Sequence, residues 1–349
     1  MFIGTYTNKG DSKGIYVYRF NTSTGNAEPV STIMSDNPSY LAIAPGGRLL
    51  YAANEAGGSN GGVSAFSFDK ATGQLQFLNK QPGGGNGPCY VSVDAHMKYV
   101  LLANYGGGSL SVLPLHEDGS VGPLSQFIQH TGQGGTADKP EKPHVHSATF
   151  SPDNKYVYVA DLGLDKISIY DFNGSLPQPL SPASPDSSSK LQPGNGPRHM
   201  SFHPTRPFVY LIEEKGGFVD AYRYKKSQLT PIQRISSHPQ GYSGVIGSAD
   251  IHVSPDGKFL YASNRGDANS IAVYTINQAD GLLKLQGIDS VLGKTPRNFV
   301  IDPTSHFLLA ANQNSDNVVI FKIDQTTGLL TPTGKELQIP SPVCLKIMP

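Results

Sequence analysis

Four side chains at corresponding positions of an internal repeat could together act on an ester: His146, Arg198, Glu214 and Arg265. A histidine accepts a proton near neutral pH. Two arginines bind a carboxylate or phosphate through forked hydrogen bonds, and they can stabilise the oxyanion of a carbonyl under attack. A carboxylate beside arginines stays ionised, so the glutamate could orient the histidine, hold a water or act as the base itself. The set suits attack of water on an ester or lactone that carries an acidic group. It suits equally proton movement next to a carboxylate.

The repeat behind these positions has a period of roughly 50 residues. Each unit contains a short strand, a turn rich in Pro, Asp, Gly or Thr, and a second strand that ends in a polar residue. These terminal polar residues are Asn54, Asn104, Asp161, Glu213, Asn264 and Asn312. A third strand and a fourth segment follow, the latter often after a turn of the form D-x-x-T-G-x-L. Four strands in each such unit indicate the blade of a β-propeller.

Seven third strands can be counted, from GIYVYRF at 14–20 to NVVIFKI at 317–323. The first unit has a second strand, FIGTYT, but no first strand, and the C-terminal SPVCLKIMP has the first-strand pattern. We therefore expect an all-β, seven-bladed β-propeller with four antiparallel strands per blade. The C-terminal strand should pair into the first blade and close the ring, which removes an exposed sheet edge. Seven blades account for the whole length, so we expect residues 1–349 to form a single domain.

In a propeller, the residues that start the first strands and those that follow the second strands converge at one face. The chain is only 15% charged, yet charged residues gather at these two positions and vary between blades. Such variation is expected where one asymmetric ligand is contacted from several directions. We expect catalytic roles for His146, Glu214, Arg198 and Arg265. We expect substrate-binding roles for Arg297, Tyr105, His199 and Glu55. The alternative interpretation is that these are ordinary polar residues at strand ends, some of them paired as salt bridges.

The charge balance and hydropathy narrow the range of partners. Lys plus Arg number 27 and so do Asp plus Glu, so the formal net charge is zero. A balanced chain argues against nucleic-acid or anionic-membrane binding. No apolar run reaches the ~18 residues of a membrane span, and no secretory signal is visible. We expect a cytoplasmic protein, a monomer or weak dimer, whose partner is a small anionic lactone.

No cofactor or metal is expected. Cys89 and Cys344 are the only cysteines, so a disulfide scaffold is unnecessary and a cysteine metal site would need other ligands. His144 and His146 in KPHVHS resemble a pair of metal ligands, but no third His or carboxylate stands at a recognisable ligand spacing. Cys89 is interpreted as a small residue lining the channel.

Two connections are longer than the others: residues 131–143 and 173–195. Both are rich in polar residues and proline and show no strand periodicity. We interpret them as surface loops between a fourth strand and the next first strand. A partial lid over one face is the functional alternative.

Three segments strongly resemble the seven-bladed propeller lactonase family: VHSATFSPDNKYVYVADLGLDKI, GPRHMSFHPTRPFVYLIEE and ADIHVSPDGKFLYASNRG. That family includes the bacterial propeller-type 6-phosphogluconolactonases and the fungal carboxy-muconate cyclases. The resemblance implies a metal-independent hydrolase. The family's His, two Arg and Glu fall on His146 in H-x-H-S, Arg198 in G-P-R-H, Glu214 at the end of L-I-E-E and Arg265 in S-N-R.

The resemblance also implies a substrate, 6-phospho-D-glucono-1,5-lactone, opened to 6-phosphogluconate in the pentose phosphate pathway. A carboxymuconate lactonising or cyclase enzyme with the same residues is the alternative, and a propeller that binds a ligand without catalysis is a third interpretation. The chain has Glu213-Glu214 where Asn-Glu is expected, so either carboxylate could point inward. Either His146 or Glu214 could be the base.

Overall fold

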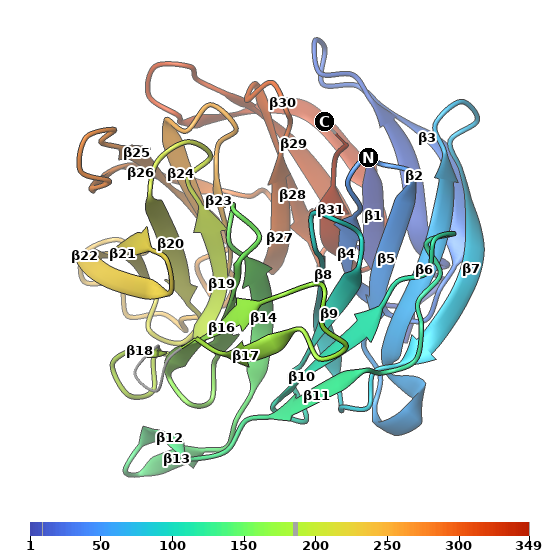
Figure 1. Ribbon diagram of the computed structural model, residues 1–349. Helices are drawn as coiled ribbons and strands as arrows, with labels where there is room; N and C mark the ends of the chain where they lie inside the picture. The colour runs from blue at the N-terminus through green and yellow to red at the C-terminus, as the bar shows by residue number, and fades with distance from the viewer. Residues whose placement is uncertain (9, 184–187, 349) are drawn as a thin grey trace. The chain divides into compact units, whose positions relative to one another are not determined.

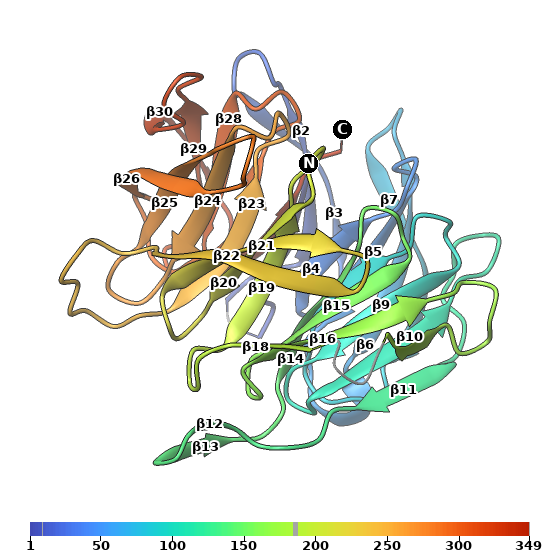
Figure 2. The same ribbon diagram turned by 60° about the vertical axis from the view of Figure 1, so that its left-hand side comes forward.

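The computed structural model describes residues 1–8, 10–183 and 188–348 of the 349-residue chain (Figures 1 and 2). Those residues form antiparallel β-sheets, with a single short 3₁₀ turn, η1, at Gly58–Asn60. Seven of the sheets contain at least four strands and follow one another along the chain. They are the seven blades of the predicted propeller, and the all-β fold class is confirmed.

The first sheet has the strand order β3-β2-β1-β31. Its strands are β1 (Phe2–Thr5), β2 (Gly14–Phe20), β3 (Ala27–Met34) and β31 (Pro342–Lys346). The last strand of the chain therefore pairs with the first, as the sequence predicted. This pairing covers the edge of β1 that would otherwise present unpaired backbone groups.

The chain forms two compact units. The first unit comprises Met1–Ile3, Tyr18–Pro29 and Arg198–Pro349, and the second comprises Gly4–Val17 and Val30–Pro197. The first unit contains three complete sheets. One is formed by β19 (Pro197–Phe202), which belongs to this unit from Arg198 onward, with β20 (Phe208–Glu213), β21 (Phe218–Lys225) and β22 (Gln228–Ser236). The second is formed by β23 (Ser248–Val253), β24 (Phe259–Asn264), β25 (Ser270–Ile276) and β26 (Leu283–Ser290), and the third by β27 (Pro296–Ile301), β28 (Phe307–Asn312), β29 (Asn317–Ile323) and β30 (Leu330–Gln338).

The second unit also contains three sheets. They are formed by β4 (Pro38–Ile43), β5 (Leu49–Asn54), β6 (Gly62–Asp69) and β7 (Gln74–Pro82); by β8 (Pro88–Val93), β9 (Tyr99–Asn104), β10 (Ser109–Pro114) and β11 (Gln126–Gln129); and by β14 (Val145–Phe150), β15 (Tyr156–Asp161), β16 (Lys166–Phe172), β17 (Leu180–Pro182) and β18 (Ser188–Lys190). A separate hairpin, β12 (Gly134–Thr136) and β13 (Lys139–Glu141), projects away from these sheets in both views (Figures 1 and 2).

Burial explains why the strands of each sheet differ in composition. Second strands such as β24, with the sequence FLYASN, are buried along their whole length because sheets of the same unit cover both faces. Fourth strands such as β22 alternate between exposed and partly buried residues, as expected at an outer edge. The polar residue that ends each second strand lies where the sequence predicted it, at the last position of the strand.

Neighbouring sheets within each unit are also linked by buried tyrosines. The Tyr261 hydroxyl on β24 donates to the Gly328 carbonyl oxygen in the β29–β30 turn, at 2.9 Å. Gly328 has a φ of +78°, and a Cβ there would come within 2.5 Å of the Phe259 ring. In the same way, the Tyr210 hydroxyl donates to the Gly281 carbonyl oxygen, and the Tyr51 hydroxyl donates to the Gly119 carbonyl oxygen. Such contacts fix each turn against the preceding sheet.

The prediction for the two long connections was partly wrong. Segment 131–143 contains the β12–β13 hairpin, and segment 173–195 contains β17 and β18, which both pair with β16. The fourth strand of that sheet therefore lies inside a segment interpreted as a loop; its residues 184–187 lie outside the described residues. These strands of three residues carry Pro, Ser and Gly without apolar alternation, so no periodic signal marks them. The lid interpretation stays a prediction.

Asp165 holds these two connections in place within the second unit. Its carboxylate accepts hydrogen bonds from the backbone N–H groups of Gly135, Gly194 and Gly196 at 2.8 to 2.9 Å. One buried carboxylate therefore fixes the hairpin and the segment that leads to β19.

Candidate active site

Glu214 forms ion pairs with two of the predicted arginines in the first unit. Its Oε2 lies 2.9 Å from the Arg198 Nε, and its Oε1 lies 3.1 Å from the Arg265 Nη2. The Arg198 side chain is 2% exposed, whereas those of Arg265 and Glu214 are 17% and 22% exposed. Three of the four residues expected to be catalytic are therefore in direct contact.

The ends of three strands bring these residues together. Arg198 lies on β19, Glu214 directly follows β20, and Arg265 directly follows β24. The backbone carbonyls of the segment 247–249 hold both arginines. Arg265 donates from Nε to the Gly247 oxygen at 3.0 Å and from Nη2 to the Ser248 oxygen at 3.2 Å. Arg198 donates from Nη1 to the Ala249 oxygen at 2.6 Å.

The charges within this cluster stabilise one another. Burial alone would raise the pKa of Glu214, but the charges of Arg265, Arg198 and Arg297 hold it below its usual value. Burial and the nearby Arg265 charge lower the pKa of Arg198 to about 10, and the Glu214 charge opposes that shift. At neutral pH the cluster therefore holds an ionised carboxylate and charged guanidinium groups, which together carry a net positive charge.

Arg297 belongs to the same electrostatic environment. It lies on β27 at a β-bulge, where Pro296 pairs with Asn312 and Asn298 pairs with Ala311. The strands β4, β8 and β14 contain the same kind of bulge, and the extra residue is Ser39, Cys89 and His146, respectively. A bulge re-aims the side chain of its extra residue. Several of the positions selected by repeat alignment are therefore bulge residues, a geometry that strand alternation does not reveal.

The structure also settles which of the two adjacent glutamates faces the arginines. Glu213 is buried and its Oε2 accepts from the Arg234 Nη2 at 2.7 Å, away from the Arg198–Glu214–Arg265 cluster. Glu214 is the carboxylate of the cluster, and its catalytic role stays a prediction.

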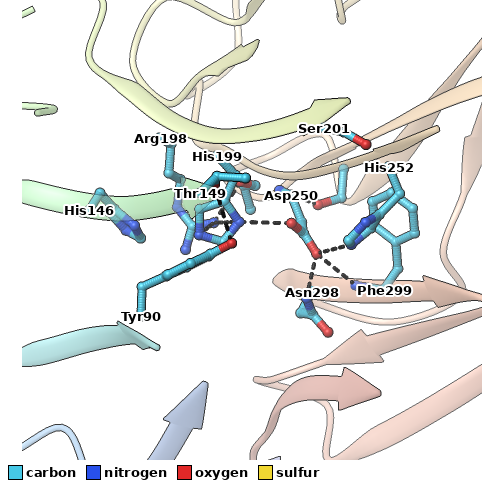
Figure 3. A network of polar contacts seen from close by, with 12 residues as sticks. Tyr90, His146, Thr149, Arg198, His199, Ser201, Asp250, His252, Asn298 and Phe299 are labelled. Atoms are coloured by element: carbon cyan, nitrogen blue, oxygen red, sulfur yellow. Dashed lines mark hydrogen bonds and ion pairs between the residues drawn. The ribbon is translucent and has the colours of Figure 1, made fainter. Parts of the chain in front are cut away.

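His199 is buried behind Arg198 and contacts a residue that the sequence analysis missed. Its Nδ1 lies 2.7 Å from the Asp250 Oδ1, and its Nε2 lies 3.3 Å from the Arg198 Nη1 (Figure 3). Burial and the Arg198 charge lower the pKa of His199 to about 3. The imidazole is therefore neutral at physiological pH, and its expected role in substrate binding stays a prediction.

Asp250 is the centre of this buried network. Its Oδ2 accepts from His252 at 2.9 Å and from the side-chain amide of Asn298 (Figure 3). Burial alone would raise the pKa of Asp250, but the charge of His252 and the hydrogen bonds from His199 and His252 hold it well below its usual range. One signal could have found it: Asp250 and His252 both fall within the first strand SADIHV, where a buried carboxylate needs partners.

The fourth expected catalytic residue, His146, lies in the second unit. Its ring meets the Tyr105 ring edge to face at 5.4 Å, and the Cys89 Sγ lies 3.9 Å from its Nδ1. Tyr105 also stacks on His144, whose Nδ1 donates to the Tyr105 carbonyl oxygen at 2.8 Å. His146 is 5% exposed. The aromatic neighbours fix the plane of the imidazole.

Glu55 lies in the same unit, directly after β5. The Tyr6 hydroxyl donates to its Oε2 at 2.8 Å. Tyr6, Glu55 and Tyr105 each directly follow the second strand of their blade, as the repeat alignment required.

The structure therefore groups the predicted residues into two sets. Within the first unit it brings together Arg198, His199, Glu214, Arg265 and Arg297. Within the second unit it brings Tyr105 to His146 and Tyr6 to Glu55. That the two sets face one ligand stays a prediction.

Among the described residues, no group of three or more His, Cys, Asp or Glu side chains is arranged to hold a metal ion. Metal independence stays a prediction. In the same part of the chain, no helix is long and apolar enough to span a membrane.

The family model for lactonases with a 7-bladed β-propeller matches residues 1–347. The chain belongs to this family. The 6-phosphogluconolactonase of Bacillus subtilis (strain 168) is 39% identical over 351 residues, which cover 99% of this chain and 97% of that relative. The 6-phosphogluconolactonase of Formosa agariphila is 39% identical over 342 residues, 97% of this chain and 96% of the relative. The solved structure of the periplasmic gluconolactonase of Pseudomonas aeruginosa is similar, with a TM-score of 0.92 and 34% identity over 98% of this chain and 96% of that one.

Proposed function

We propose that the protein hydrolyses 6-phospho-D-glucono-1,5-lactone to 6-phosphogluconate, a step of the pentose phosphate pathway. The observation that carries this proposal is the Arg198–Glu214–Arg265 cluster in a chain of the lactonase family. A cluster with a net positive charge suits a substrate that carries a phosphate and develops an oxyanion. Two relatives that are 39% identical over nearly the whole chain are named 6-phosphogluconolactonase.

In the proposed reaction a water attacks the lactone carbonyl carbon. His146 takes one proton from this water, because Glu214 is a poor base with its pKa held below the usual value. The carbonyl oxygen becomes an oxyanion, which Arg198 stabilises. The bond between the carbonyl carbon and the ring oxygen then breaks, and His146 returns the proton to that oxygen. The product is the open-chain carboxylic acid, which ionises at neutral pH.

The other arginines are assigned to the far end of the substrate. Arg265 is more exposed than Arg198, and Arg297 contributes its charge to the same cluster. We assign both to the phosphate, which carries two negative charges and lies several ångströms from the carbonyl. Tyr105 and Glu55 are assigned to the hydroxyl groups of the sugar ring, for which a carboxylate and an aromatic face are suitable partners.

Glu214 acts in this scheme as the residue that orients the arginines. It occupies one edge of each guanidinium and leaves the remaining N–H groups to other partners. The planar guanidinium fork loses little freedom when one edge is fixed, so both arginines are preorganised for an anion.

The test is a substrate panel with the purified protein: freshly prepared 6-phosphogluconolactone, unphosphorylated glucono-1,5-lactone and carboxymuconate. Rates are corrected for spontaneous hydrolysis, and His116→Gln serves as a control because His116 is exposed and outside the predicted site. The proposal expects the highest kcat/KM for the phosphorylated lactone. A higher value for carboxymuconate would assign a cyclase, and tight anion binding without turnover would assign a binding protein.

We also propose a cytoplasmic location, a monomeric or weakly dimeric state, and a single domain over residues 1–349. Cell fractionation tests the first, and recovery in the periplasm would overturn it. Analytical ultracentrifugation tests the second, where a stable tetramer would be the contrary result. The third expects one cooperative unfolding transition, and two separate transitions would contradict it.

A further inference from the structure

The buried Asp250 carboxylate is surrounded by four hydrogen-bond donors. His199 contacts its Oδ1 at 2.7 Å, while His252, Asn298 and the Phe299 backbone N–H contact its Oδ2 (Figure 3). Asp250 and Asn298 are each 1% exposed. A buried carboxylate is tolerated only where its oxygens are satisfied in this way. None of the functional assignments above uses this network.

The chemistry of the donors fixes their orientation. An ionised carboxylate can only accept, so the His199 Nδ1 carries the proton and donates it to Asp250. The Arg198 Nη1 lies 3.4 Å from the Nδ1 and 3.3 Å from the Nε2 of His199, so the guanidinium packs against the imidazole ring. A neutral His199 is required, because a protonated ring would place a positive charge against the guanidinium; its pKa, lowered to about 3, agrees.

The opposite side of Asp250 leads to the end of the chain. The Asn298 Oδ1 accepts from the backbone N–H of Leu345, on β31, at 2.6 Å. With its oxygen occupied, the Asn298 amide must turn its Nδ2 toward Asp250. A continuous series of hydrogen bonds therefore runs from Leu345 through Asn298 and Asp250 to His199, and the His199 ring contacts the Arg198 guanidinium.

We propose that Asp250 is a positioning residue, which locks His199 so that it holds the Arg198 guanidinium against Glu214 and which ties this arginine to the closing strand β31. A second contact supports the role: Arg198 Nη1 also donates to the carbonyl oxygen of Ala249, the residue before Asp250. The segment that anchors the carboxylate therefore also anchors the arginine. The kinetic part of this inference rests on the proposed lactonase function, and the positioning of Arg198 does not.

Asp250→Asn tests the network with almost no change in volume. An asparagine offers one oxygen and one NH₂ group, whereas all four partners of Asp250 are donors. The NH₂ group must then oppose either the His199 N–H or the donors on the Asn298 side, and either choice breaks the series. The matched control is Asp302→Asn, because Asp302 is also a buried aspartate of the first unit, but it accepts backbone N–H groups in the β27–β28 turn.

The kinetic readout is a double-mutant cycle with Arg198→Met on 6-phosphogluconolactone. Asp250→Asn should lower kcat by roughly 10- to 100-fold with little change in KM, the scale of a misplacement of about 1 Å. Since Asp250 acts through Arg198, the double variant should be no slower than Arg198→Met alone. The control Asp302→Asn should keep kcat and KM while lowering the melting temperature. Multiplicative losses in the double variant would overturn the proposal in favour of a merely structural role.

A second readout is independent of activity. With ¹⁵N-arginine labelling, the Arg198 Nε–H signal is identified by its loss in Arg198→Met, and its ion pair with Glu214 should slow its exchange with water. Asp250→Asn should shift or broaden this signal, and Asp302→Asn should not. If the protein opens no lactone but the signal moves, the proposed function fails and the positioning role stands; an unmoved signal overturns the role.

Conservative replacement supplies a third comparison, should Asp250→Asn fold poorly. Glutamine at position 199 retains a donor for Asp250 and a planar polar group that can contact the Arg198 guanidinium, whereas leucine retains neither. The inference expects His199→Gln to keep at least about 10-fold more of kcat than His199→Leu. Equal activity of the two variants would overturn it.

Discussion

The neutral state of buried His199 predicts how the stability of the protein responds to acid. Burial and the Arg198 charge lower the pKa of His199 from an ordinary value of 6.5 to about 3 in the folded protein. Between these values the unfolded chain binds a proton at this histidine and the folded protein does not. The stability contribution is therefore fully present above the unfolded pKa and is lost as the pH falls from about 7 toward 3.

The magnitude follows from the size of this shift. One proton bound by the unfolded state alone changes the free energy of unfolding by about 1.4 kcal/mol per pH unit. Between pH 7 and pH 5 the histidine becomes protonated in the unfolded chain. This protonation at His199 alone should lower the free energy of unfolding by about 2 kcal/mol. In this range the carboxylate of Asp250 is ionised in both states and adds no slope, because its folded pKa lies well below the usual value.

The perturbation is His199→Gln, which keeps a donor and an acceptor at the position but does not titrate. Urea unfolding at pH 7, 6 and 5, checked for reversibility, gives the free energy of unfolding of the wild type and the variant. Other histidines contribute to both proteins, and the pKa values of His203 and His238 are also lowered by burial. The difference between the two proteins isolates position 199.

Between pH 7 and pH 5, the free energy of unfolding of the variant should fall by about 2 kcal/mol less than that of the wild type. His116→Gln, at an exposed position, should behave like the wild type. If wild type and His199→Gln lose the same stability between pH 7 and pH 5, then His199 is not neutral and buried against Arg198, and the reasoning is wrong.

Three further predictions address closure, the arginines and metal dependence. Deleting residues 340–349 removes β31, exposes the edge of β1 and should cause aggregation or a large fall in melting temperature; a truncated protein that melts like the parent would contradict the closure. Arg198→Met should lower kcat by roughly 10²- to 10³-fold, the scale for loss of an oxyanion donor, whereas Arg265→Met should mainly raise KM; a KM-only effect at Arg198 would reverse the assignment. Activity should survive dialysis against a strong chelator because the arginine charges disfavour a bound cation; complete loss, with recovery on adding calcium or zinc, would contradict this.

The repeat made most of the fold predictable. Second strands end at Asn54, Asn264 and the other expected polar residues, and the third strands expected at 14–20 and 317–323 match their bounds, because buried central strands carry a strong apolar signal. The C-terminal closing strand was predictable for the same reason. The short strands β17 and β18 were not, since they depend on pairing with β16 and carry no pattern of their own.

The candidate site was predictable only in part. Repeat alignment selected Arg198, Glu214 and Arg265 because charged residues at these positions differ from blade to blade, and the structure places these three in contact. It did not select Asp250 or Asn298, which stand one residue beyond the aligned positions. Their importance depends on bulges and on contacts between sheets, which are set by strand register that a single sequence does not encode.

The most direct test of the central claim is the rate of 6-phosphogluconolactone hydrolysis by the wild type and by an Arg198→Met/Arg265→Met double variant. The lactone is freshly prepared, spontaneous opening is subtracted, and circular dichroism confirms that both proteins are folded. We expect the wild type to accelerate ring opening strongly. The double variant should lose at least about 10³-fold in kcat/KM, because it lacks both the oxyanion donor and the phosphate ligand. A folded double variant that opens the lactone as fast as the wild type would contradict the account.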